Sequence, residues 1–587
     1  MSTTLTTGAT GLPLPLDVAL ARMKLSDALP PLSEVLNRVV TNRNVLQDFT
    51  PLDTCLESQL SNECWQSAGL QLFTENDVPY AINNNSQLSD QVSETLFRNC
   101  AEFEPTDRLA ILECGAGTGL FARYLLDAFQ ARCREAGKDY YDRLTYFVTD
   151  GSRRTVQQWT ELGLFATHAD HVVLGICDAM QALHCEPLDG QSIALPGMRA
   201  IFGNYLFDTL PSTVIRRGSE GCEELVVRTR LVEDADRLKQ YTSLAVDELR
   251  ALANGTAGNG DHRPDRSALA SLVSCFDYET AFRPLTRPLP GAEEALAVGA
   301  GLERVLLNHG ALQCMDACMA RLEATGFMIV NDYGPVQSDQ IATQAVSQRF
   351  GRTIATGVNF PLLQHHASAL GWVMVKPDED DARSIHTRLI ASTRLPGTFE
   401  AFAEQFGFQE HQFEKLPEDA RRHMEAGRQD EAMECYKRAL AHHPNDWRLL
   451  GEIAEFLIRS LSDYDAGLSA GRAALAINPW YSPWLWNVVG DALYATNAIN
   501  EAHEAYLQGF RIDPNDVRTN LNLAYTLGSL ARHAEALDAL ARGLAADSAG
   551  IFRDRLFEKQ QNILTMLAAK AAGEQEWLNR RATRLRG

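Results

Sequence analysis

The sequence predicts a mainly parallel, doubly wound α/β domain of the Rossmann-like class, followed by an all-α solenoid. Three observations predict this. Strand-like apolar segments alternate with helical stretches over roughly the first two thirds of the chain. A glycine-rich turn joins the first of these strands to its helix, and prolines recur every 35 residues in the last third. A chain of 587 residues also exceeds what one core usually holds, so at least two domains are expected.

The alternating part defines the expected domain boundaries. We expect strands at 109–113, 144–149, 171–176, 199–204, 224–231, 326–332 and 370–376. A polar, helix-forming insertion over 232–310 interrupts them and would build or close a substrate pocket. The expected domains are an N-terminal helical region or lid (1–105), the α/β core (106–376), a linker (377–414) and the solenoid (415–587).

The solenoid is predicted from an internal repeat. Pro444, Pro479 and Pro514 are each preceded by a helix with small residues on its packing face. A pair of helices of about 34 residues closed by a proline is typical of tetratricopeptide (TPR) repeats. Residues 552–571 would form a final capping helix. The array could be a concave groove for a polypeptide, or a module for dimerisation or packing, and the sequence leaves both open.

Composition narrows the class of protein. The net charge of −22 lies almost wholly in the first 414 residues, because residues 415–587 hold 21 basic and 23 acidic side chains. This balance argues against a nucleic-acid-binding surface and could attract a basic substrate. Without a secretory signal or an apolar run of about 18 residues, we expect a cytoplasmic protein that does not enter the membrane. The 12 cysteines show no metal-ligand spacing, so no metal is expected.

The glycine-rich turn is the strongest functional signal. The strand over 109–113 ends at Glu113 and continues into Cys-Gly-Ala-Gly-Thr-Gly, where glycine lets a ligand approach the backbone. The next strand ends at Asp150, where a carboxylate could hold the hydroxyls of a ribose. A dinucleotide enzyme usually places its acidic residue earlier. The pattern therefore favours S-adenosyl-L-methionine (SAM) as cofactor, and hence methyl transfer with S-adenosyl-L-homocysteine as product.

Four segments in order carry a resemblance to a known family. They are Leu112-Glu-Cys-Gly-Ala-Gly-Thr-Gly119, Val148-Thr-Asp-Gly-Ser152, Gly203-Asn-Tyr-Leu-Phe-Asp-Thr-Leu-Pro211 and Val330-Asn-Asp-Tyr-Gly334. Over residues 70–375 the sequence resembles the MidA-like family of SAM-dependent methyltransferases, which includes a mitochondrial protein that methylates an arginine. The repeats lie outside the resemblance. Tyr205 stands where the family has a glutamate, so the acceptor need not be the same.

The candidate cofactor residues follow from the strand ends and the resemblance. They are Glu113, Gly115, Ala116, Gly117, Thr118, Gly119, Asp150, Gly151, Ser152, Asp178, Ala179 and Asn204. We expect the amides of the turn to face the methionine carboxylate, Glu113 its ammonium group, directly or through water, and Asp150 the ribose. Asp178 would bind the adenine amino group, with a backbone contact from Ala179. The alternative for Asp150 and Asp178 is a helix N-cap.

The candidate acceptor residues follow the fourth strand. Asn204 could orient a nitrogen nucleophile, and Asp208 could hold a cationic acceptor or take its proton; alternatively Asp208 caps a helix. Candidate substrate-binding residues are Tyr80, Asn83, Tyr205, Asp332 and Tyr333, the first two in a possible lid over the cofactor.

Three functions fit these features. The first is an N-methyltransferase of a peptide or protein side chain, arginine favoured, whose TPR array holds the polypeptide. The second is a small-molecule O- or N-methyltransferase that uses the repeats for dimerisation. The third is an assembly factor or scaffold that binds SAM without turnover. The sequence does not identify the acceptor, the number of methyl groups added or the oligomeric state.

Overall fold

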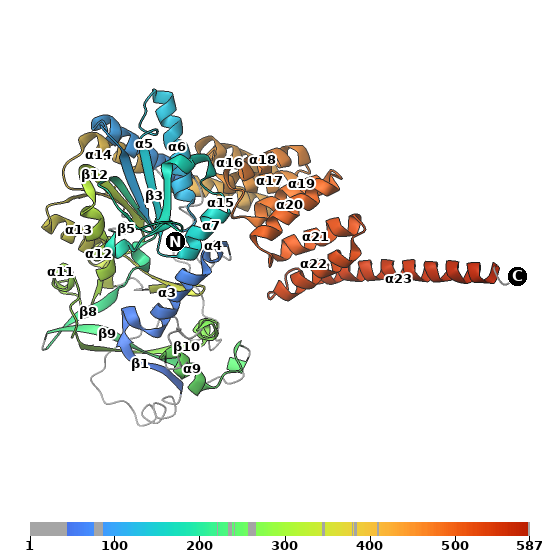
Figure 1. Cartoon of the computed structure of the whole chain (residues 1–587), viewed down its shortest axis with the longest axis horizontal. Coiled ribbons are helices and arrows are strands. Elements are labelled where there is room, and N and C mark those ends of the chain that lie inside the picture. The colour runs from blue at the N-terminus through green and yellow to red at the C-terminus, as the bar shows by residue number, and fades with distance from the viewer. Residues whose placement is uncertain are drawn as a thin grey trace. The chain divides into compact units, whose positions relative to one another are not determined.

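A computed structural model of the chain shows two compact units that divide at residues 408 and 409 (Figure 1). The structure describes residues 44–74, 86–182, 184–219, 221–232, 238–239, 241–255, 266–342, 347–378, 380, 384–407 and 410–584. The first unit holds the sheets, and the second is helical. This division lies a few residues before the expected start of the solenoid.

A seven-stranded sheet forms the centre of the first unit, in the order β15-β16-β12-β7-β2-β3-β4. The strands are β2 (Leu109–Cys114), β3 (Leu144–Asp150), β4 (Val172–Ile176), β7 (Met198–Asn204), β12 (Leu322–Asp332), β15 (Val373–Val375) and β16 (His386–Ala391). Neighbouring strands from β12 to β4 are parallel, whereas β16 runs antiparallel to both of its neighbours. The mixed α/β fold with a parallel sheet is confirmed, and the ends of its parallel strands gather at one edge.

Helices cover both faces of this sheet, which is why its central strands are buried on both sides. They are α5 (Gln87–Glu102), α6 (Leu120–Ala136), α7 (Arg153–Glu161), α12 (His309–Met319), α13 (Phe360–Ala369) and α14 (Pro396–Phe406). On one face Leu112 and Ile201 share a core with Leu312 of α12. On the other face Phe202 of β7 contacts Phe121 of α6, with ring centroids 5.5 Å apart.

A second, five-stranded sheet was not expected. It consists of β1 (Val45–Pro51), β8 (Thr213–Gly218), β9 (Gly221–Leu231), β10 (Phe276–Pro284) and β11 (Val305–Leu307). The helical assignments of 1–105 and 232–310 are therefore only partly right, since β1 lies in the first range and β10 and β11 lie in the second. The helices α9 (Val246–Ala253), α10 (Ser267–Ala270) and α11 (Ala292–Val298) do lie in the insertion.

The expected linker over 377–414 is also corrected, because it contains β16 and α14. All six residues of β16 are buried, although the strand begins with three polar ones. These are paired: Asp380 accepts from Arg388 Nη1 at 2.7 Å and contacts His386 Nδ1 at 3.1 Å, and Thr387 bonds to Asn331 of β12. Because hydrogen bonds satisfy these polar side chains, the strand can be buried although its sequence does not alternate between apolar and polar residues.

The second unit is a series of antiparallel helix pairs. It contains α15 (Glu410–Glu425), α16 (Gln429–His442), α17 (Trp447–Ser460), α18 (Tyr464–Ile477), α19 (Pro483–Ala495), α20 (Ile499–Ile512), α21 (Val517–Ser529), α22 (His533–Ala546) and α23 (Arg553–Arg584). The helices α16, α18 and α20 each end two residues before a repeated proline. Small residues allow close packing: a Cβ at Gly490 of α19 would lie 2.3 Å from the ring of Tyr506 on α20.

Within the part of the chain that the structure describes, no helix combines the length and apolar character needed to cross a bilayer.

A half-buried histidine makes the stability of the first unit depend on pH. His366 of α13 contacts Glu294 of α11 and Asp316 of α12, both at 2.8 Å, and these carboxylates raise its pKa to about 9 from 6.5. The two carboxylates stabilise the protonated form of His366. This contribution to the stability of the fold is complete below pH 6.5 and is lost as the pH rises through 9. Solvent screens the partly exposed carboxylates of Glu294 and Asp316. We therefore expect the free energy of unfolding, measured with urea, to fall by about 2 kcal/mol between pH 6.5 and pH 9. His366→Gln should abolish this loss; an unchanged pH profile would contradict the assignment.

Candidate active site

The glycine-rich turn between β2 and α6 adopts the conformation that its glycines predict. Gly115, Gly117 and Gly119 have φ angles of 66°, 53° and 73°, in the left-handed region that favours glycine. There is also no room for side chains: a Cβ would lie 2.9 Å from Leu206 Cδ1 at Gly115, and 2.9 Å from Phe73 Cζ at Gly117. The turn is a narrow cradle that only glycine can form.

Three amides of this turn bond within the protein, which corrects the expectation that the whole run faces the cofactor's carboxylate. The amide of Ala116 donates to Thr149 O at 2.9 Å, that of Gly117 to Asp150 Oδ2 at 3.0 Å, and that of Gly119 to Ala116 O at 2.8 Å. A tight turn satisfies its own donors because buried amides without partners are costly. Thr118 is a buried residue of the turn, and its Oγ1 accepts the amide of Leu120, the first residue of α6, at 3.3 Å.

Asp150 is fixed beside this turn at the end of β3. Its second carboxylate oxygen, Oδ1, accepts the amide of Ser152 at 2.8 Å, and Gly151 lies between them. Burial raises the pKa of Asp150 to about 6, although the two amide bonds act in the opposite direction. Ser152, not Asp150, caps α7 by accepting from Thr155 N, so the N-cap alternative for Asp150 is wrong.

Asp178 follows the end of β4, the strand that neighbours β3 on the side away from β2. The amide of Cys177 donates to Asp150 O at 3.1 Å, which ties the two strand ends together. The exposed Asp178 side chain caps a 3-10 helix by accepting from Met180 N at 3.0 Å, so its N-cap alternative is confirmed, and the next residue, Ala179, is buried. An exposed cap still leaves carboxylate surface for a ligand.

A buried hydrogen-bond chain crosses five neighbouring strands, from β3 to β16. Asn204 of β7 donates to Glu113 Oε1 at 3.2 Å and accepts from Asn331 Nδ2 of β12 at 2.6 Å. Tyr146 donates to Glu113 Oε2 at 3.2 Å, and Thr387 donates to Asn331 Oδ1 at 2.7 Å. Register explains these contacts, because Asn331 is paired with Asn204 and with Thr387 across the sheet.

This chain of hydrogen bonds gives Glu113 and Asn204 a structural role as well. Glu113 has no exposed surface, and burial raises its pKa to about 8. Each of its carboxylate oxygens accepts one hydrogen bond within the protein, so Glu113 positions Asn204, while its expected contact with the cofactor's ammonium group stays a prediction. The amide of Asn204 is oriented from both sides, and Asn331 is a site residue that the sequence did not reveal.

An acidic pair lies at the ends of β7 and β12. Asp208 follows β7, and its amide donates to Asp332 Oδ2 at 3.1 Å, while the amide of Tyr333 donates to Asp332 Oδ1 at 2.9 Å. Burial raises the pKa of Asp208 to about 7, and burial together with the negative charge of Asp208 raises that of Asp332 well above its usual value. Among the described residues, neither Asp208 Oδ1 nor the Tyr333 hydroxyl has a hydrogen-bond partner, although both atoms are buried.

The segment between Asn204 and Asp208 is held in a strained conformation. Tyr205 has a φ of 48°, which is unfavourable for a residue with a side chain. Its amide donates to Asn331 O at 2.8 Å, and the turn brings Leu206 against Gly115. Leu206 precedes the 3-10 helix that contains Asp208, so Asp208 is not a helix cap and that alternative is wrong.

The expected cover of the cofactor site is only partly visible. Tyr80 and Asn83 lie outside the described residues. Before them, α3 (Leu56–Ala68) and α4 (Gln71–Thr74) do cover the turn: Gln66 O accepts from Ser152 Oγ at 3.0 Å, and the ring of Phe73 lies against Gly117. Phe73 was missed because an isolated aromatic residue in a short helix gives no pattern.

The geometry fits SAM. A cradle that excludes any Cβ and a buried carboxylate at the end of the next strand suit a nucleoside that carries an amino-acid tail. No group of three His, Cys, Asp or Glu within the described ranges is arranged to hold a metal ion.

The family comparison agrees with this geometry. Residues 92–370 match the model of a family described as "Putative S-adenosyl-L-methionine-dependent methyltransferase". These residues include the turn, Asp150 and the acidic pair. The protein is therefore a SAM-dependent methyltransferase, and SAM is its cofactor.

Individual solved structures resemble parts of the chain. An uncharacterized protein of Burkholderia thailandensis is 17% identical over 66% of this chain and 97% of its own, with a TM-score of 0.35. A superfamily member from the same organism, bound to S-adenosyl-homocysteine, is 15% identical over 64% of this chain and 98% of its own, with a TM-score of 0.33. The first TPR domain of human RPAP3 is 24% identical over 21% of this chain and 94% of its own, with a TM-score of 0.20. No curated protein matches the chain.

Proposed function

We propose that the protein methylates a nitrogen of a peptide or protein side chain, with arginine the favoured acceptor. The observation that carries this proposal is the acidic pair, in which Asp208 Oδ1 and the Tyr333 hydroxyl are buried and have no hydrogen-bond partner in the described part of the chain. Two buried carboxylates whose negative charges repel each other need a cation or a proton. A cationic nitrogen of the acceptor would supply that charge and bond to both unpartnered atoms.

The proposed chemistry rests mainly on positioning. When bound, SAM supplies a methyl group on a positively charged sulfur, which is activated for in-line displacement. The cradle and Asp150 would hold the nucleoside, and Asn204 would orient the nucleophile. Asp208 would receive the proton that a cationic acceptor loses. Because positioning by itself lowers the barrier by several kcal/mol, a weak base suffices.

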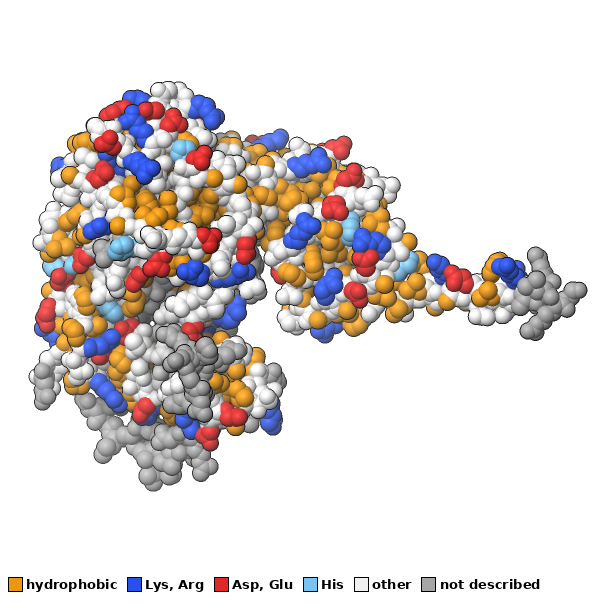
Figure 2. All heavy atoms as spheres, in the orientation of Figure 1, with side chains coloured by type: hydrophobic (Ala, Val, Ile, Leu, Met, Phe, Trp, Pro, Cys, Tyr) orange, Lys and Arg blue, Asp and Glu red, His pale blue; other side chains and the backbone are white. Residues whose placement is uncertain are grey.

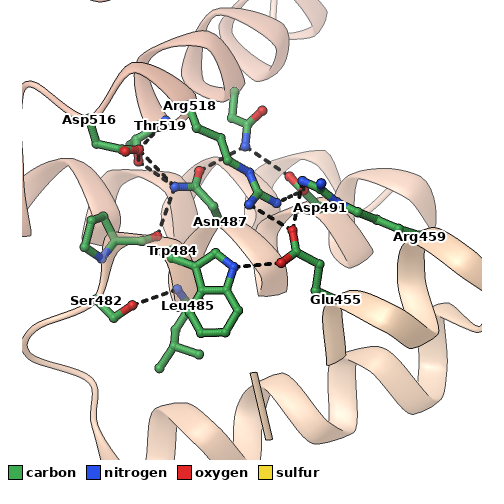
Figure 3. Close-up of polar contacts among 12 residues, drawn as sticks. Glu455, Arg459, Ser482, Trp484, Leu485, Asn487, Asp491, Asp516, Arg518 and Thr519 are labelled. Atoms are coloured by element: carbon green, nitrogen blue, oxygen red, sulfur yellow. Dashed lines mark hydrogen bonds and ion pairs between the residues drawn. The ribbon is translucent and has the colours of Figure 1, made fainter. Parts of the chain in front are cut away.

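The helical unit is proposed as a TPR array that holds the polypeptide. Its alternate helices α17, α19 and α21 share a partly exposed polar network (Figure 3). Arg518 of α21 donates to Glu455 of α17 at 3.1 Å and to Asp491 of α19 at 2.7 Å, and Trp484 also donates to Glu455, at 3.0 Å. Asn522 donates to Asn487 Oδ1 at 2.9 Å. A surface of charged, amide and aromatic side chains across successive helices suits an extended peptide.

Removal of the helical unit tests this role. For a chain that ends at Phe408 we expect the KM for a full-length polypeptide acceptor to rise at least tenfold, because remote binding energy is lost. The affinity for S-adenosyl-homocysteine, measured by calorimetry, should stay within twofold of the full chain. A peptide of ten residues around the acceptor serves as the control and should be methylated equally by both chains. Equal KM values for the full-length acceptor would refute the groove.

A further inference from the structure

The helix α23 carries most of the exposed apolar surface of the helical unit. Among the described residues, 12 large apolar side chains are exposed, and five of them lie in α23: Phe557, Leu564, Met566, Trp577 and Leu578. Figure 1 shows the helix continuing as a single rod past α21 and α22, and Figure 2 shows apolar side chains among charged ones along it. Such a helix lacks the tertiary packing that normally stabilises helices.

Only the start of α23 caps the array. Leu556 and Ile563 are buried, and Leu556 lies against Gly543 of α22. From Ala568 to Arg581, by contrast, every side chain is exposed. The exposed part is therefore not needed to close the helical unit.

The exposed apolar residues follow a regular spacing. Phe557, Leu564, Ala571 and Leu578 recur every seven residues, and their exposed fractions are 52%, 49% and 52% for the three large ones. A seven-residue apolar repeat on a helix is the pattern of a seam that packs against another helix. The seam lies beside the buried stripe of Leu556 and Ile563, so both can be occupied at once.

We propose that this seam pairs with the same seam of a second copy of the chain, in antiparallel orientation about Ala571. In that arrangement Leu564 of one copy lies opposite Leu578 of the other, and the small residue Ala571 lies at the crossing, where the helices approach most closely. A two-fold interface is self-complementary in this way by symmetry. The proposal is independent of the methyl acceptor.

Charge selects the orientation. Glu574 and Arg581 each follow a seam residue by three positions and so lie on the same side of the helix. In a parallel pair, each would face the identical residue of the second copy, and the like charges would repel. About Ala571, the antiparallel pair places Glu574 opposite Ala568 and Arg581 opposite Gln561 instead. About Ala571 the helices overlap over residues 558–584, a strip of about 40 Å by 10 Å, so the pair buries about 800 Å² in total, the size of a weak interface.

Sedimentation of the full chain tests the interface. We expect a dimer at 50 µM and a monomer for Leu564→Glu/Leu578→Glu, with a dissociation constant raised at least 100-fold. The matched control is Asn562→Glu/Ala569→Glu, which places the same charges on the opposite, exposed face and should remain dimeric. Circular dichroism verifies that each variant keeps its helix content. A monomeric wild type, or a dimer that survives the seam substitutions, would overturn the proposal.

Cross-linking tests the orientation. With diamide, Leu564→Cys/Leu578→Cys should form a covalent dimer, whereas either single cysteine variant should not, because position 564 faces 578. A covalent dimer of the Leu564→Cys variant alone would indicate a parallel pair and overturn the antiparallel arrangement. Wild type serves as the background control, since its cysteines are free and ten of the 12 are buried.

Discussion

Asp150→Ala is expected to weaken the binding of S-adenosyl-homocysteine about 100-fold, as measured by isothermal titration calorimetry. The carboxylate holds the amides of Gly117 and Ser152, and in the proposed site it also accepts the ribose hydroxyls. Loss of charge-assisted hydrogen bonds at a buried site costs about 3 kcal/mol, which corresponds to about two decades of affinity.

Asp178→Ala is the matched control, because it removes another carboxylate at a neighbouring strand end. Its side chain is exposed and caps a short helix, so the loss of affinity should stay below tenfold. Thermal unfolding verifies that both variants fold. If the two variants lost affinity equally, the proposal that Asp150 binds the ribose of the cofactor would be wrong.

Asp208→Asn is expected to lower kcat at least 100-fold for transfer of labelled methyl from SAM to an arginine-containing acceptor. The substitution removes the proposed proton acceptor and half of the acidic pair, and general-base groups contribute 10²–10⁴-fold. In the wild type the rate should rise with pH through about 7, because Asp208 must lose its proton to act. The rate of the variant should not show this rise.

Two controls separate this role from a structural one. The affinity of Asp208→Asn for S-adenosyl-homocysteine should remain within threefold, since the residue does not contact the turn in the proposed site. Tyr333→Phe removes the other unpartnered polar atom without a change of charge and should cost about tenfold in kcat. A wild-type level of turnover in Asp208→Asn would rule out Asp208 as the base.

Local patterns predicted the features that depend on local geometry. The conformation of the turn follows from its glycines, and Asp150 follows from the end of a buried strand. The sequence could also have suggested that Asp208 and Asp332 approach each other, because β7 and β12 are parallel neighbours whose carboxyl ends meet. Such features need only the strand pattern and the rule that parallel strands end at one edge.

Features that depend on distant partners were not predictable in the same way. The strand β16 is hidden by polar residues that are paired with Asp380 and Asn331. The hydrogen bonds to Glu113 come from Tyr146 and Asn204 on other strands, so the local sequence does not indicate them. By contrast, β10 had a recognisable signal in the alternation of Phe276, Asp277, Tyr278 and Glu279, which the polar composition around it obscured.

A crystal structure of the complex with S-adenosyl-homocysteine tests the central claim most directly. The account predicts that the ribose hydroxyls bond to Asp150, that the amino-acid tail lies along the turn of Gly115 to Gly119, and that the sulfur points toward Asn204 and Asp208. A complex in which the nucleoside lies away from the ends of β2 and β3, or in which Asp150 makes no contact with it, would contradict the account.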